Sequence, residues 1–164
     1  MTKMKVIVLG IFFLVIIGSV YSQTDKVYDP DADAKKDIEE AIKKATKNGK
    51  HVFLQIGGNW CPWCIKFHNF VQADEELRNY QTTNFEVVKV NYDNVNRQEE
   101  LMEKLGFPQR FGFPVFVILD SNGNRIHTQN SAFLEKDKSY DGKRVLQFFK
   151  NWSVAAIDPE SYKK

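Results

Sequence analysis

Cysteine is scarce in this sequence: its 164 residues include two cysteines, Cys61 and Cys64, with two residues between them. A disulfide across so short a loop would constrain the unfolded chain little. A chain of this length also buries enough apolar surface to form one domain without covalent cross-links. The composition therefore excludes a small domain held together by disulfides, and the cysteine pair is better explained by chemistry than by stability.

An excess of one charge is also lacking once the N-terminal segment is set aside. Residues 1–22 contain two lysines and no acidic residue, so the rest of the chain carries 21 basic and 21 acidic residues. The chain has no basic tract, no internal repeat and no low-complexity stretch. Nucleic-acid binding proteins rely on basic surfaces, so we expect no nucleic-acid partner.

A long hydrophobic run occurs at the N-terminus, at residues 6–20. Lys3 and Lys5 precede it, and Val20-Tyr21-Ser22 ends it with small residues at the positions that signal peptidase reads. This pattern predicts a signal peptide at residues 1–22, cleaved near Ser22/Gln23, and a secreted or periplasmic protein. The alternative is an uncleaved anchor, although a membrane span needs ~20 apolar residues.

The remaining chain divides into a linker (23–33), a domain (34–155) and a C-terminal tail (156–164). Hydrophobic periodicity predicts alternating helices and strands in the domain. The expected strands are 51–57, 85–91, 115–119 and 125–128, and the expected helices lie around 38–45, 62–71, 97–105 and 145–152. Helical connections make the early strands parallel, and the turn at 121–124 makes the last two antiparallel. The predicted fold class is α/β, with a mixed four-stranded sheet and helices on both faces.

The segment Trp60-Cys61-Pro62-Trp63-Cys64 combines two thiols with a helix start. Only a thiolate attacks a disulfide, whereas a thiol with a pKa of about 8.5 is mostly protonated at neutral pH. Pro62 suits the first helical position, so the free N–H groups and the positive helix end favour the Cys61 thiolate. Three residues along a helix return the second sulfur to the same face. Cys61 can therefore attack a disulfide, and Cys64 can release the product.

From about Ala34 to Trp152 these motifs resemble the thioredoxin family, and the resemblance implies the thioredoxin fold. It also implies that Cys61 is an exposed nucleophile and Cys64 a buried resolving thiol. Residues 87–93 resemble the family's central strand, including its lysine, Lys89. Phe113-Pro114 resembles the cis-proline segment, which would help dock an extended substrate.

Three features depart from the family pattern: Gln55 stands where a buried acid is typical, Asn69 stands near the place of a helix-kinking proline, and the connection 129–141 is longer. Gln55 cannot ionise, so it can only orient a water or donate a hydrogen bond. We therefore assign Gln55 and Lys89 supporting roles. Trp60 and Trp63 are candidates for substrate docking beside Phe113 and Pro114, or else packed aromatics.

The sequence thus predicts a monomeric thiol–disulfide oxidoreductase without a cofactor, reducing disulfides of exported proteins. The dipeptide Pro62-Trp63 contains no histidine, which favours a reductant over a strong oxidant. In an oxidising compartment a reductase needs electrons, so a membrane electron-transfer protein is an implied partner. The alternatives are an oxidase or isomerase on the same fold, a redox-inert interaction domain, and a metallochaperone using Cys61, Cys64 and His68. Zinc sites usually have four ligands, so no metal site is predicted.

Overall fold

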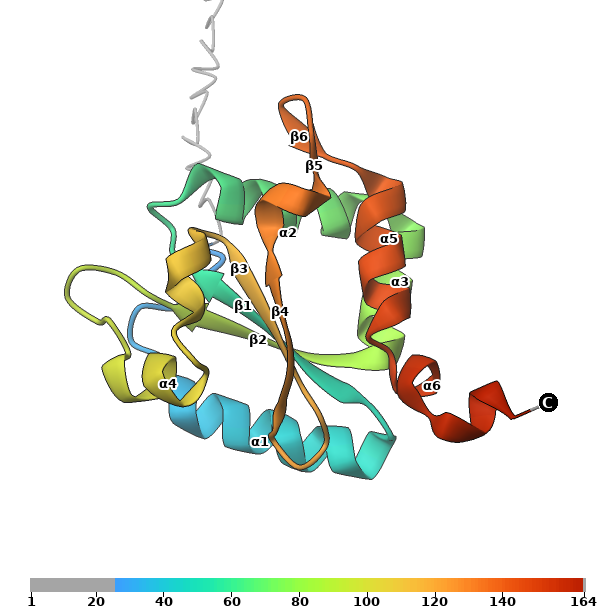
Figure 1. Ribbon diagram of the computed structural model, residues 1–164. Coiled ribbons are helices and arrows are strands. Elements are labelled where there is room, and N and C mark those ends of the chain that lie inside the picture. The colour runs from blue at the N-terminus through green and yellow to red at the C-terminus, as the bar shows by residue number, and fades with distance from the viewer. Residues whose placement is uncertain (1–25, 164) are drawn as a thin grey trace, which may run out of the picture.

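A computed structural model describes residues 26–163 of the protein (Figure 1). The predicted signal peptide and its cleavage site lie outside the described residues. No helix within residues 26–163 combines the length and apolar character that crossing a membrane requires.

Four strands form the central sheet in the order β2-β1-β3-β4: β1 (His51–Gly57), β2 (Phe85–Asn91), β3 (Val115–Leu119) and β4 (Arg125–Asn130). β1 and β2 are parallel because helices connect them. β3 is antiparallel to β1, and β4, which follows a tight turn, is antiparallel to β3. The mixed four-stranded sheet predicted from the sequence is confirmed.

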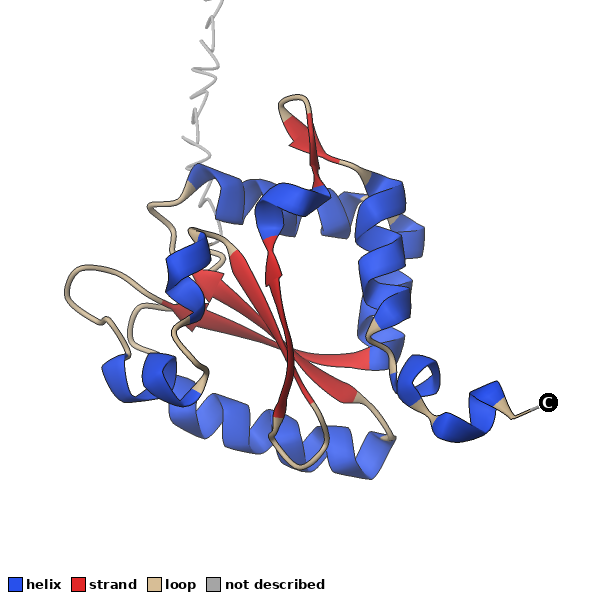
Figure 2. Cartoon of the chain, in the orientation of Figure 1, coloured by secondary structure: helices blue, strands red, loops and turns tan. Residues whose placement is uncertain are grey.

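Helices cover both faces of this sheet, as Figure 2 shows. One face carries α1 (Ala34–Asn48) and α4 (Glu99–Lys104), and the other carries α2 (Pro62–Ala73), α3 (Glu75–Asn84) and α5 (Gly142–Asn151). The chain continues after α5 through α6 (Val154–Ile157) and a 3₁₀ turn (Pro159–Tyr162), so the predicted tail forms short, mostly exposed helical turns.

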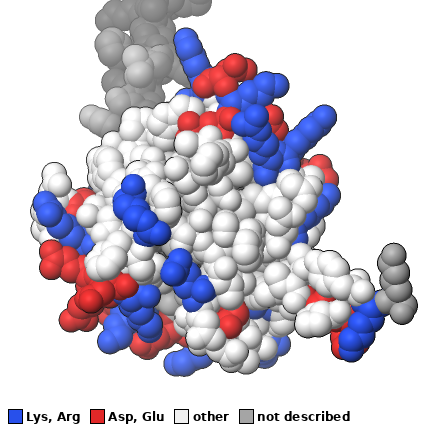
Figure 3. All heavy atoms as spheres, in the orientation of Figure 1, with Lys and Arg blue, Asp and Glu red and all other residues white. Residues whose placement is uncertain are grey.

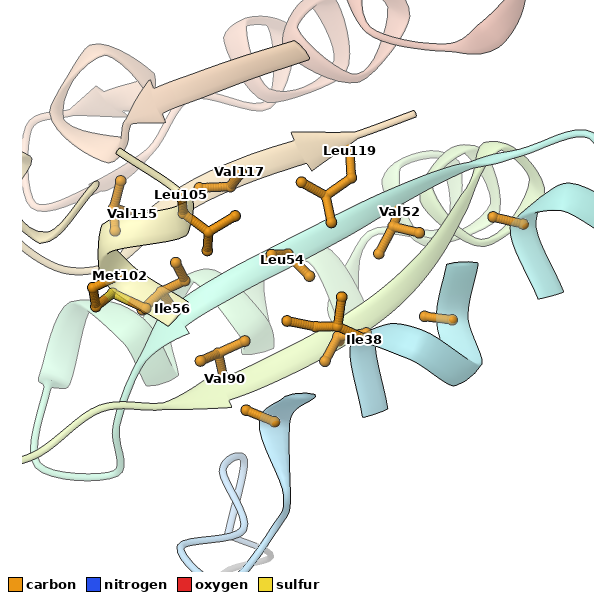
Figure 4. Close-up of a cluster of buried hydrophobic side chains, with 14 residues drawn as sticks. Ile38, Val52, Leu54, Ile56, Val90, Met102, Leu105, Val115, Val117 and Leu119 are labelled. Atoms are coloured by element: carbon orange, nitrogen blue, oxygen red, sulfur yellow. The ribbon is translucent and has the colours of Figure 1, made fainter. Parts of the chain in front are cut away.

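Alternation along β1 decides which side chains face which helices. Its even-numbered residues, Val52, Leu54 and Ile56, belong to the core beneath α1 (Figure 4). Phe53 belongs to the opposite core, where its ring centroid lies 5.3 Å from that of Phe116. Successive strand residues point to opposite faces, so Gln55 shares the side of Phe53 and faces α2. This placement brings a polar side chain beneath the cysteines.

The helix α3 was not predicted from the sequence. Leu77 and Gln81 are its only buried side chains, so its apolar stripe is too sparse to show helical periodicity. Asp74 caps it by accepting the N–H of Leu77, and Glu75 and Glu76 lie in its first turn, where acidic residues suit the helix dipole. These capping residues were the available signal.

The long connection at 129–141 is structured. It extends β4 to Asn130 and continues through a 3₁₀ turn (Ser131–Leu134) into a small hairpin of β5 (Glu135–Lys136) and β6 (Ser139–Tyr140). The hairpin lies next to α2 (Figure 1). Lys66 on α2 donates a hydrogen bond to the carbonyl of Lys138 at 2.7 Å. The connection therefore contacts the helix that begins at the cysteines.

Surface charges of both signs occur together on the face that Figure 3 shows. Lysine and arginine lie among aspartate and glutamate around its edge, and much of its middle is uncharged. This distribution agrees with the balanced charge of the chain after residue 22.

Candidate active site

The cysteine pair lies at the N-terminus of α2 as a disulfide, with the two Cα atoms 5.2 Å apart. Cys61 is the N-cap, Pro62 the first helical residue, and the Cys61 sulfur accepts a hydrogen bond from the N–H of Cys64 at 3.2 Å. This N–H, which the Cys61 carbonyl also accepts at 3.0 Å, favours the charged form of the sulfur. The local chain thus builds the environment that a nucleophilic cysteine needs.

Burial of the two cysteines differs from the simple expectation. Cys64 is fully buried, but Cys61 is only 4 % exposed rather than open to solvent. The disulfide holds the Cys61 sulfur against Cys64, and Trp63 and Phe113 pack against the pair. Cys61 is still the more exposed of the two cysteines, as the resemblance implies.

An aromatic platform, formed by Trp60, Tyr92 and Phe113, lies beside the cysteines. Trp60 is 54 % exposed, donates its Nε1–H to the carbonyl of Tyr92 at 2.8 Å and meets the Phe113 ring edge-on at 5.4 Å. The Phe113–Pro114 peptide bond is cis, as the resemblance implied, and Pro114 is buried. The platform therefore presents exposed ring surface beside the cysteines, while the polar atom of Trp60 is already occupied.

Trp63 occupies a different position from Trp60. Its ring meets that of Tyr140 on β6 edge-on at 5.4 Å, and Lys66 Nζ lies 4.4 Å from its centroid. The Tyr140 hydroxyl also donates to the carbonyl of Trp63 at 3.2 Å. The hairpin thus fixes Trp63, which is only partly exposed.

A buried polar network lies beneath Cys64. Gln55 is fully buried, and its Nε2 donates to the Cys64 carbonyl at 3.1 Å and to the Tyr28 hydroxyl at 2.7 Å. Its Oε1 accepts a hydrogen bond from Lys89 on β2, which pairs with Gln55 across the sheet. The two supporting residues predicted from the sequence therefore lie together, and Gln55 contacts Cys64.

Tyr28 was missed by sequence reasoning, which placed it in a loose linker. It is fully buried and packs against Cys61 and Cys64. The segment around it is polar, so no periodicity marked Tyr28 as a core residue. A single aromatic residue in such a segment was the only available signal.

Burial changes the titration of two basic groups near this network. It lowers the pKa of Lys89 to about 7, because a charged amine loses hydration there. Burial also lowers the pKa of His68, and the nearby charge of Lys89 adds to this effect. Lys89 thus changes between its charged and neutral forms near neutral pH.

Replacing Lys89 by methionine is expected to flatten the pH dependence of stability. The folded protein releases the Lys89 proton near pH 7, whereas the unfolded chain retains it to about its ordinary pKa of 10.5. Below pH 7 both the folded and the unfolded state bind the proton, so the full cost of burying the charge lowers the free energy of unfolding. Above pH 7 the unfolded state binds more protons than the folded state, so the free energy of unfolding rises with pH. Urea denaturation between pH about 7 and about 10 measures this rise.

Lys104→Met is the control, because Lys104 is an exposed lysine of α4. It should keep the wild-type slope of stability against pH over the same range, whereas Lys89→Met should lose it. Equal slopes in all three proteins would contradict a proton released from Lys89 near pH 7.

The three residues of the metallochaperone alternative, Cys61, Cys64 and His68, do not come together as a metal-binding group in the structure. Within residues 26–163 there is no group of three or more histidine, cysteine, aspartate or glutamate side chains that could hold a metal ion. His68 follows Cys64 by one helical turn, but its Nδ1 is buried without a hydrogen-bond partner among the described residues.

The chain is similar in sequence to known proteins. Residues 38–136 match a family described as a thioredoxin-like domain. The chain is 25 % identical over 112 residues, 61 % of this chain and 68 % of the relative, to the disulfide bond reductase DsbH of Chlamydia pneumoniae.

Two solved structures extend the comparison. A disulphide isomerase from Xylella fastidiosa Temecula1 is similar with a TM-score of 0.70 and 26 % identity, covering 78 % of this chain and 97 % of that one. A thioredoxin from Thermus thermophilus, with a TM-score of 0.51 and 22 % identity, covers 69 % of this chain and 81 % of that one and shares the fold. The family match spans more than half of this chain, and the Cys61–Cys64 pair lies at the start of α2. The chain therefore belongs to the thioredoxin-like domain family and is a disulfide oxidoreductase with a CxxC pair.

Proposed function

We propose that this protein reduces disulfides of exported proteins by dithiol–disulfide exchange through Cys61-Pro62-Trp63-Cys64. The observation that carries the proposal is the position of Cys61 at the N-cap of α2, where its sulfur accepts the N–H of Cys64. Such a position lowers the pKa of a thiol, so Cys61 attacks as a thiolate at neutral pH. The exchange uses no cofactor.

The reaction takes two steps. The Cys61 thiolate attacks one sulfur of the substrate disulfide, which breaks that bond, expels one substrate thiolate and forms a mixed disulfide. Cys64 then loses its proton to water and attacks the Cys61 sulfur, which releases the second substrate thiolate, and the released thiolates take up protons from water. Two electrons pass to the substrate, and Cys61 and Cys64 end as the disulfide seen in the structure.

Substrate docking is assigned to the surface around the cysteines. The exposed ring of Trp60, together with Phe113 and the buried Pro114, offers apolar contact to an extended segment on either side of a disulfide. Trp63 contributes the part of its ring that the hairpin leaves uncovered. Aromatic side chains of this kind contribute strongly to protein recognition.

The physiological direction distinguishes two candidate functions. The Chlamydia relative is named a reductase and the Xylella structure an isomerase. The two residues between the cysteines are Pro62 and Trp63, so no histidine lies there to stabilise the Cys61 thiolate strongly. We therefore favour the reductase. The reduction potential should then be nearer to that of thioredoxin, about −270 mV, than to that of protein disulfide isomerase, about −180 mV.

Equilibration with glutathione or dithiothreitol measures this potential, and insulin reduction measures the activity. A potential near that of protein disulfide isomerase, with refolding of scrambled ribonuclease but slow insulin reduction, would overturn the reductase in favour of the isomerase.

We place the protein, as a monomer, outside the cytoplasm. The predicted signal peptide at residues 1–22 supports this location. Because such a compartment is oxidising, a membrane electron-transfer protein would return electrons to the Cys61–Cys64 disulfide. N-terminal sequencing of the exported fraction should find Gln23 first; Met1 on exported protein would contradict cleavage.

A further inference from the structure

Tyr28 is held in place by the loop that carries the cysteines. The side-chain amide of Asn59 accepts the N–H of Tyr28 at 3.1 Å and donates to its carbonyl at 2.6 Å. Asn59 lies two residues before Cys61. The backbone of the segment before α1 is therefore fixed to the active-site loop, and the Tyr28 side chain is buried against the disulfide.

The network around Gln55 determines the direction of each hydrogen bond. The Cys64 carbonyl can only accept, so the Gln55 amide must direct Nε2 toward it. The same Nε2 donates to the Tyr28 oxygen, and Oε1 is occupied by Lys89. The Tyr28 hydroxyl is thus an acceptor toward Gln55, and its own hydrogen is left for another group. No hydrogen bond within the described part of the chain is donated by this hydroxyl.

The Cys64 sulfur lies close to this hydroxyl, because both atoms border the space beside Gly57. Gly57, at the end of β1, has no side chain, and a Cβ there would lie 2.4 Å from the Cys64 sulfur and 3.1 Å from the Tyr28 oxygen. A side chain at position 57 would therefore separate the Tyr28 hydroxyl from the Cys64 sulfur. Tyr28, Cys61 and Cys64 form one packed cluster.

We propose that the Tyr28 hydroxyl donates a hydrogen bond to the Cys64 thiolate when Cys64 resolves the mixed disulfide. The proposal rests on the two-step exchange described above. A buried sulfur resists ionisation, and a hydrogen bond to its charged form offsets that resistance. Gln55 cannot supply this bond, since its donor nitrogen is directed to the Cys64 carbonyl and to Tyr28. Tyr28 is therefore the hydroxyl that can stabilise the Cys64 thiolate where residue 55 cannot.

The surroundings keep Tyr28 a donor. Burial raises the pKa of Tyr28, so the hydroxyl retains its hydrogen throughout the neutral range and stabilises the thiolate without taking its proton. The other titratable groups near Cys64 are Cys61, His68 one turn along α2, and Lys89, which reaches the site through Gln55. Lys89 and His68 change charge with pH, whereas the contribution of Tyr28 is constant.

The test is Tyr28→Phe, which keeps the ring and removes the hydroxyl. Release of product from the mixed disulfide should slow by about ten- to a hundredfold, while attack by Cys61 keeps its wild-type rate. In a Cys61→Ser background, the pKa of Cys64, measured from the pH dependence of its alkylation, should rise by about one to two units. Tyr80→Phe, which removes the hydroxyl of a partly buried tyrosine on α3, is the matched control and should change neither quantity.

A packing role alone would lower the melting temperature and leave both the release rate and the Cys64 pKa at their wild-type values, and this result would overturn the proposal. If Tyr28→Phe does not fold, Asn59→Ala loosens the same segment and should slow release in the same direction; unchanged release would again overturn it. Failure of wild-type insulin reduction would instead contradict the proposed reductase and leave the effect on the Cys64 pKa to be judged separately.

Discussion

Replacing Cys64 by serine is expected to abolish turnover and to trap substrates covalently on Cys61. Attack needs only the Cys61 thiolate, which the N-terminus of α2 favours, so the mixed disulfide still forms. Release needs a second thiolate, and a serine hydroxyl does not ionise at neutral pH. Serine is also slightly smaller than cysteine, so it fits the space beside Gly57 without a clash. Non-reducing electrophoresis with mass spectrometry of the trapped species measures the result.

Cys61→Ser is the matched control for this experiment. It leaves Cys64 as the one thiol, fully buried beneath α2, and should trap no substrate. Comparable trapping by the two variants would show that both sulfurs reach the substrate and would contradict the division of roles between them.

The parts of the site that follow from local chain geometry could be predicted from the sequence. The spacing of Cys61 and Cys64 and the proline between them determine a helix start with both sulfurs on one side, and the structure has this arrangement. The strands β1 and β3 were predicted because their apolar runs are nearly continuous and bounded by turn residues, β2 because of its valines, and β4 because a tight turn precedes it. The resemblance indicated Lys89 as a supporting residue, but its pairing with Gln55 could not be predicted, since strand pairing is not visible in a single sequence.

Residues whose role depends on tertiary packing could not be predicted in this way. β1 is buried on both faces, so its hydrophobicity does not show which face Gln55 shares. Tyr28 reaches the site from a segment without secondary structure, through a clamp by Asn59 that lies 31 positions away in the chain. The clamp and the buried amide network are long-range contacts, and neither leaves a local pattern.

Replacing Gln55 by glutamate is expected to accelerate release by Cys64 at neutral pH and to destabilise the fold. Glutamate has the same length as glutamine, so one carboxylate oxygen keeps its contact with Lys89. The other oxygen replaces Nε2 beside Cys64 and can accept the thiol proton as a general base, an effect often worth about a hundredfold or more. Stopped-flow measurement of mixed-disulfide decay reports the release rate.

The cost to stability comes from the same exchange of atoms. The Cys64 carbonyl loses the N–H that it accepts from Gln55 and faces a carboxylate instead. An unsatisfied buried acceptor costs about 1–3 kcal/mol, and burying an ionisable group adds to this. Gln81→Glu, at a buried glutamine of α3, is the matched control: it should destabilise the protein without accelerating release. Unchanged stability and decay in Gln55→Glu would contradict the position of Gln55 beneath the site.

The Gln55→Glu change should also remove the dependence of release on Tyr28. In the wild type the Gln55 amide donates to the Tyr28 oxygen, which leaves the hydroxyl hydrogen for Cys64. A carboxylate at position 55 only accepts, so the hydroxyl turns its hydrogen toward Glu and away from the sulfur. The loss of about ten- to a hundredfold in release rate expected for Tyr28→Phe should therefore be much smaller when position 55 is also glutamate.

Release rates of the wild type, the two single variants and the double variant give the coupling between the two positions. If the effects of the two substitutions on the free energy of activation for release are additive, Tyr28 and residue 55 act on Cys64 independently. That result would contradict control of Cys64 by the directed network of hydrogen bonds.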